Sequence, residues 1–109
     1  MCIDIENVFL AKLDLHDDKD FENFIKCEEP ARNFIVIENK DFSSCSDKSK
    51  CRNKKINGKC PCEIKVYNIR PYTFEIIGAL QQFFEIVAIA FLPYSDISHI
   101  IDHFEKILN

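Results

Sequence analysis

Four of the six cysteines fall within one eighteen-residue window, and they are the residues best placed to do chemistry. They are Cys45, Cys51, Cys60 and Cys62, and their spacing is C-x5-C-x8-C-x-C. Four thiolates are enough to close a tetrahedral zinc site. The window contains few large apolar side chains, so metal binding would have to order a segment that has no hydrophobic core of its own. The spacing therefore predicts a structural zinc site formed by these four cysteines.

The residue types leave the chemistry of this window partly open. Pro61 separates the last two cysteines and fixes a backbone dihedral, which lowers the entropy lost when the pair closes on an ion. An iron–sulfur cluster is an alternative to zinc, because such clusters are also held by four thiolates. Disulfides or a redox-active dithiol form a third interpretation. The spacing is not the C-x2-C pairing of a zinc ribbon, so the sequence does not choose among these by motif alone.

The same window carries a strong positive charge. Six basic residues stand against one acid between Cys45 and Cys62, whereas the rest of the chain has eight bases and seventeen acids. A basic lobe on an acidic body is explained by a solvated charged loop, and it also suits a partner that carries negative charge, such as a protein surface, a phosphate ligand or a nucleic acid. Aromatic residues that could stack on bases are absent from the window. The predicted partner-binding residues are Lys48, Lys50, Arg52, Lys54, Lys55 and Lys59.

The remaining candidate ligands have simpler explanations. His99 and His103 are one helical turn apart, but no third ligand accompanies them, so two exposed histidines are expected. His16 stands among four aspartates that helix capping explains without a bound cation. Cys27 is expected to be a small, partly buried apolar residue. No nucleophile–base or metalloprotease motif is present, so the sequence favours a non-catalytic protein over an enzyme.

The sequence also bears on the cellular location of the protein and on whether it crosses a membrane. The first six residues carry acids where an export signal would carry Lys or Arg, which predicts a cytoplasmic protein. Thiols in a reducing compartment bind metals more often than they form disulfides. The most apolar stretch, residues 74–92, contains Glu75, Gln81 and Glu85, each of which is costly in hydrocarbon. A transmembrane helix is therefore not expected.

Hydrophobic periodicity predicts four strands and three helices. Alternation over residues 3–15 predicts a strand with one buried face, and Phe34–Ile37 is a short apolar run of the kind found in buried strands. Two further strands are expected at 63–69 and at 85–92. The expected helices begin near Asp17, Thr73 and Ser95 or Asp96, where short polar side chains can cap them.

This order of elements predicts an α+β fold. At 109 residues the chain forms one domain, 1–109, with residues 43–62 as a metal-binding, Cys-rich loop inserted in it. The pattern β-α-β, insertion, β-α-β is that of a ferredoxin-like (βαββαβ) antiparallel sheet with helices on one face. An extra C-terminal helix is expected, and the insertion lies between strands 2 and 3. We therefore expect a small zinc-binding module with a protein partner, and as the alternative an iron–sulfur or dithiol redox protein.

Overall fold

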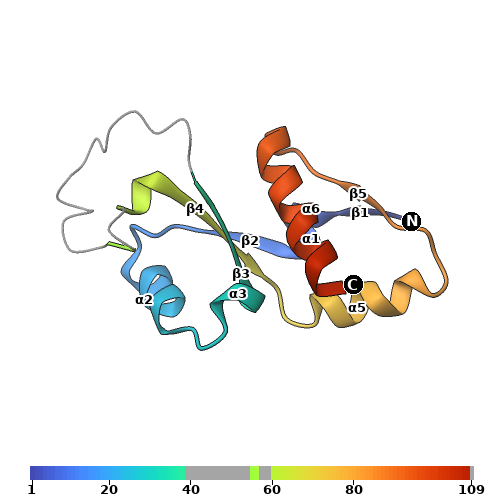
Figure 1. Cartoon of the computed structure of the whole chain (residues 1–109), viewed down its shortest axis with the longest axis horizontal. Helices are drawn as coiled ribbons and strands as arrows, with labels where there is room; N and C mark the ends of the chain where they lie inside the picture. The colour runs from blue at the N-terminus through green and yellow to red at the C-terminus, as the bar shows by residue number, and fades with distance from the viewer. Residues whose placement is uncertain (39–54, 57–59, 109) are drawn as a thin grey trace. The chain divides into compact units, whose positions relative to one another are not determined.

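The computed structural model describes residues 1–38, 55–56 and 60–108 (Figure 1). The chain forms two compact units. One comprises residues 1–11 together with 68–109, and the other comprises residues 12–67. The predicted α+β class is confirmed, because helices and strands alternate along the chain and the strands form two sheets, one antiparallel and one parallel.

The antiparallel sheet has three strands. β4 (Ile64–Ile69) lies in the centre, between β2 (Leu10–Leu13) and β3 (Phe34–Glu38). The helices α2 (Asp18–Lys26) and α3 (Pro30–Asn33) connect β2 to β3. Helices therefore connect β2 to β3, and β4 lies between these two strands. This is the split β-α-β arrangement, so this part of the predicted order is present.

Residues 12–67 have their own apolar core. Phe24 of α2 contacts Phe34 of β3 edge to face, with ring centroids 5.1 Å apart and planes at 82°. Offset or perpendicular ring pairs of this kind contribute about 0.5–1.5 kcal/mol beyond the area they bury. Alternate residues of β4 complete the cluster from the sheet, as expected for a strand with one covered face. The buried members are Leu15, Phe24, Phe34, Ile64 and Val66.

Capping determines where α2 begins. The Asp17 carboxylate accepts hydrogen bonds from the backbone N–H groups of Lys19 and Asp20, at 2.9 and 3.1 Å. Those donors have no partner inside the helix, so the aspartate satisfies them and fixes the N-terminus. The sequence-based expectation of a helix starting near Asp17 is therefore confirmed.

The other unit contains the parallel sheet and two long helices. β1 (Cys2–Asp4) pairs in parallel with β5 (Val87–Ile89), in the register Cys2 to Val87 and Asp4 to Ile89. α5 (Thr73–Gln81) contacts α6 (Tyr94–Leu108) through Phe74 and Phe104, whose rings are 5.3 Å apart. α6 is the expected C-terminal helix, and it buries Ile100 and Phe104.

The single four-stranded antiparallel sheet of the ferredoxin-like prediction is not formed by the described residues. The strand expected over residues 3–15 is interrupted by the short helix α1 (Ile5–Val8). The cause is local, because the Asp4 side chain accepts hydrogen bonds from the backbone and side-chain nitrogens of Asn7 and so caps a helical turn. The chain before this turn pairs in parallel with β5, and the chain after it joins the antiparallel sheet.

Candidate metal centre

The last two cysteines of the window lie on one tight turn. Pro61–Glu63 form the 3-10 turn η1, which leads directly into β4. Cys60 precedes this turn and Cys62 lies within it, and both side chains are half-buried. Pro61 is buried at the first position of the turn, where its fixed dihedral and missing N–H are tolerated. Pro61 therefore lies in a turn, with Cys60 immediately before this proline and Cys62 immediately after it.

Reciprocal hydrogen bonds fix Cys60. Its backbone N–H donates to Oε2 of Glu63 at 2.7 Å, and its sulfur accepts from the backbone N–H of Glu63. This is a capping box in which a thiol takes the place of the usual hydroxyl. Cys60 therefore has a defined orientation at the start of the turn.

Cys62 contacts a histidine from another part of the sequence. Its Sγ lies 3.2 Å from Nε2 of His16, although 46 residues separate the two in the chain. His16 follows β2 on the connection to α2 and is half-buried. A sulfur and an imidazole nitrogen at this separation can share a proton, form a thiolate–imidazolium pair, or bind one metal ion.

The acids around His16 are engaged in backbone capping. Asp14 accepts the backbone N–H of His16 at 3.0 Å, and Asp20 accepts the backbone N–H of Asp14 at 3.2 Å. Asp17 caps α2. Asp17 therefore caps the helix as expected, and Asp14 and Asp20 accept backbone N–H groups beside the start of the helix. The histidine among these acids contacts the cysteine turn, which the sequence analysis did not anticipate.

A signal for this contact was available in the predicted topology. In a split β-α-β sheet, the first and third strands are antiparallel neighbours. The end of the first strand therefore lies beside the start of the third, which brings residue 16 close to residue 62. Spacing along the chain alone does not reveal the pair.

Cys45 and Cys51 lie outside the described residues, as do the basic residues Lys48, Lys50, Arg52, Lys54 and Lys59. Lys55 is described and its side chain is exposed. Within residues 1–38, 55–56 and 60–108, no three His, Cys, Asp or Glu side chains converge in a way that could hold a metal ion. The described part of the candidate centre is therefore the pair His16 and Cys62, with Cys60 two residues away.

The remaining candidate residues are Cys27, His99 and His103. Cys27 packs against the core cluster and accepts a hydrogen bond from the Asn33 side chain at 3.5 Å, which confirms the expectation of a partly buried thiol. His99 is exposed, as expected. The expectation of exposure is wrong for His103, whose Nε2 is enclosed and has no hydrogen-bond partner among the described residues. Burial, and secondly the positive charge of Lys106, lower the pKa of His103 below its ordinary value.

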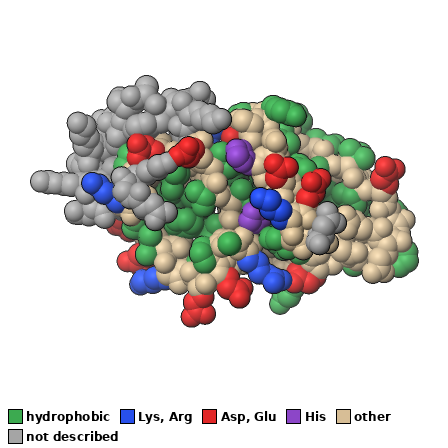
Figure 2. Space-filling view, viewed as in Figure 1, with side chains coloured by type: hydrophobic (Ala, Val, Ile, Leu, Met, Phe, Trp, Pro, Cys, Tyr) green, Lys and Arg blue, Asp and Glu red, His purple; other side chains and the backbone are tan. Residues whose placement is uncertain are grey.

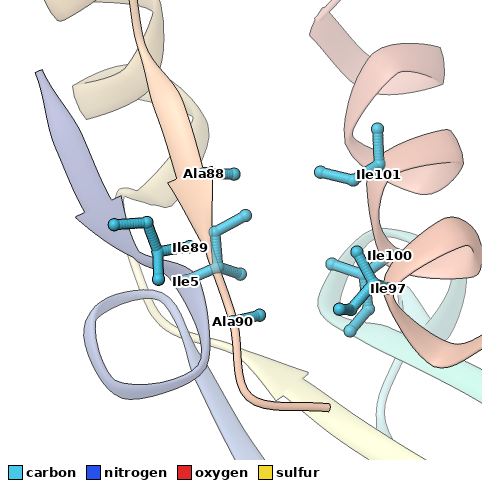
Figure 3. Close-up of a pocket in the computed structure, with 7 residues that line it drawn as sticks. All are labelled: Ile5, Ala88, Ile89, Ala90, Ile97, Ile100 and Ile101. Carbon is cyan, nitrogen blue, oxygen red and sulfur yellow. The ribbon is translucent and has the colours of Figure 1, made fainter. Parts of the chain in front are cut away.

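A small apolar cavity lies between β5 and α6. Figure 3 shows Ala88 and Ala90 on one side of a gap, facing isoleucines of α6. The cavity has a volume of about 300 Å³. Its lining side chains contain no polar group that could orient a ligand or do chemistry, which specific binding sites normally provide. The lining residues are Ile5, Ala88, Ile89, Ala90, Ile97, Ile100 and Ile101.

The surface carries both charges and apolar groups. Asp and Glu side chains are distributed over the face shown in Figure 2, with Lys and Arg interspersed among them. Several large apolar side chains on and beside β5 are exposed, including Val87 at 52% and Phe91 at 85%. Among the described residues, no helix has both the length and the apolar character needed to cross a bilayer.

Comparisons with protein-family models, with curated proteins and with solved structures found no match to this chain.

Proposed function

We propose that this protein binds a structural zinc ion through thiolates of Cys60 and Cys62, with Cys45 and Cys51 as further ligands. The observation that carries the proposal is the turn that presents Cys60 and Cys62 together, with an imidazole nitrogen 3.2 Å from the second sulfur. The capping box that holds Cys60 supports it, because N–H donors to sulfur are the outer interactions that orient metal-bound thiolates.

A structural role is favoured over a redox role by the rigidity of this turn. Both ends of η1 are fixed, by the Cys60–Glu63 hydrogen bonds on one side and by β4 on the other. Thiolates that ligate zinc are protected by the metal and need a reducing compartment, in agreement with the cytoplasmic location expected from the sequence. An iron–sulfur cluster at the same cysteines is the competing assignment.

We further propose that the module acts by binding a protein partner. The basic residues of the window, from Lys48 to Lys59, would supply charge complementarity to an acidic surface. Phosphate groups are the alternative ligand of that charge. Exposed apolar side chains beside β5 would supply contact area, and among the described strands β5 pairs only with β1.

The metal assignment is tested on the full chain purified without chelator. We expect zinc near one equivalent per chain by elemental analysis, and a colourless protein. Cys62→Ser should lower the zinc content. Cys2→Ser is the matched control, because Cys2 is an exposed cysteine on β1 rather than on the cysteine turn.

Three outcomes would decide against the proposal. A brown protein that contains iron and sulfide would assign the cysteines to a cluster. Metal-free protein that does not bind added zinc would exclude the site. Equal zinc loss in Cys2→Ser and Cys62→Ser would show that zinc binds thiols without a defined centre.

A further inference from the structure

The contact between His16 and Cys62 joins two elements that the sequence separates. His16 lies on the connection between β2 and α2, and Cys62 lies on the turn that leads into β4. β2 and β4 are neighbours in the antiparallel sheet, so the sheet itself fixes the distance between these two segments. Hydrogen bonds hold both ends of the pair: the backbone N–H of His16 donates to the Asp14 carboxylate, and the backbone N–H of Glu63 donates to the carbonyl oxygen of Cys60. The pair is therefore built into the fold and does not depend on long, flexible side chains.

The separation of the two atoms fits adjacent ligands of one ion. With zinc–sulfur and zinc–nitrogen distances of about 2.3 and 2.0 Å, tetrahedral geometry places the two ligand atoms roughly 3.5 Å apart. The observed Nε2–Sγ distance of 3.2 Å is a few tenths of an ångström shorter. A small outward movement of either side chain would admit the ion. Neutral imidazole and thiolate are both preferred zinc ligands.

We propose that Nε2 of His16 is a ligand of the zinc ion and binds it beside Sγ of Cys62. This inference rests on the proposed function, and it changes the composition of that site. One imidazole and three thiolates fill a tetrahedral zinc site, so only three of the four cysteines in the window are needed. A Cys3His centre also carries one negative charge fewer than a four-thiolate centre. The ion would then tie the start of α2 to the start of β4.

A catalytic cysteine is the other chemistry that this pair could support. A thiolate–imidazolium pair activates cysteine as a nucleophile in several enzyme classes. That interpretation leaves the other cysteines of the window unexplained, including the capped Cys60 two residues away. Metal binding explains both the contact between His16 and Cys62 and the presence of the other cysteines. The geometry therefore favours metal ligation over nucleophilic catalysis.

The test uses the full chain loaded with zinc, and with Co²⁺ as a spectroscopic substitute. His16→Ala should lower zinc affinity at least about tenfold, because losing a ligand costs at least as much as losing an outer-shell partner. His16→Cys should retain the metal, and its Co²⁺ absorption bands should move to longer wavelength as sulfur replaces nitrogen. His99→Ala is the matched control, since it removes an exposed histidine on α6. Each of the four cysteines of the window is also replaced singly by serine, and one of these four variants should bind zinc with near-normal affinity.

The outcomes separate this inference from the proposed function. If wild-type protein binds zinc and His16→Ala binds it equally well with an unchanged Co²⁺ spectrum, the histidine ligand is refuted and the zinc site stands. If wild-type protein binds neither metal, both proposals fail. Rapid alkylation of Cys62 at acidic pH in wild-type protein, lost in His16→Ala and unaffected by zinc, would identify a thiolate–imidazolium pair and overturn ligation.

Discussion

The three histidines show how environment decides what one residue type can do. His16 meets a sulfur at hydrogen-bond distance, His99 is exposed, and His103 has an enclosed ring nitrogen. The sequence places each of them near charged residues and does not distinguish them. Cys60 and Cys62 were selected as candidate ligands from their spacing and from the intervening Pro61, all of which is local information. The partner of Cys62 was not identified because the spacing of residues along the chain does not show it, and only the pairing of the first and third predicted strands brings residue 16 close to residue 62.

His103 predicts a pH dependence of stability. Its pKa in the folded chain is lowered, by burial first and by Lys106 second, whereas the unfolded chain titrates near about 6.5. Between these values the unfolded chain binds a proton that the folded chain does not, so the free energy of unfolding should fall as pH decreases below about 6.5. NMR titration of the ring protons should give a midpoint below the ordinary value. Urea unfolding with chelator present should show a weaker pH dependence for His103→Phe.

The exposed His99 provides the control for that measurement. His99→Phe removes a histidine from the same helix without touching the enclosed ring. Its pH dependence of unfolding should resemble that of the wild type. Equal flattening in both variants would mean that the enclosed nitrogen of His103 does not cause the effect.

At the scale of elements, the sequence predicted most element positions and the β2-β4-β3 order, but it did not predict the parallel pairing of β1 with β5. β3 and β4 lie within about a residue of the predicted ranges, because alternating or β-branched runs bounded by polar residues specify strands. The first predicted strand was too long, since the hydrogen bonds between Asp4 and Asn7 favour a helical turn over continued extension. The strand expected over 85–92 is reduced to Val87–Ile89, and its side chains are exposed. No alternation pattern indicates that it pairs with β1 in parallel.

The packing of α2 on the sheet predicts a contrast between two adjacent residues. Phe24 is 8% exposed and contacts Phe34, whereas its neighbour Ile25 is 52% exposed. Phe24→Ala should lower the free energy of unfolding by about 3–5 kcal/mol, because it removes a buried ring and leaves a cavity. Ile25→Ala should change it by less than about 0.5 kcal/mol. Chemical denaturation of both variants measures the difference, and Phe24→Leu supplies a milder change if the alanine variant does not fold. Similar losses for Phe24→Ala and Ile25→Ala would contradict this placement of α2.

At the scale of the whole molecule, the candidate centre and the apolar cavity belong to different units. His16, Cys60 and Cys62 lie within residues 12–67, and the cavity beside α6 lies within residues 1–11 and 68–109. Each unit has buried apolar residues of its own, such as Phe24 and Val66 in one and Ile100 and Phe104 in the other. The candidate ligands therefore belong to the same unit as most of the antiparallel sheet, which would hold them in position.

This division predicts where zinc stabilises the chain. A ligand that binds only the folded state at one hundred times its dissociation constant adds about 2.7 kcal/mol to the free energy of unfolding. Because the candidate ligands belong to residues 12–67, hydrogen exchange should slow on zinc addition for amides of α2 and the start of β4. Amides of α6 in the other unit serve as the internal reference and should exchange at an unchanged rate. Equal slowing in α6 and α2 would show that the two units open together, and an unchanged rate in α2 with zinc bound would place the ion elsewhere in the chain.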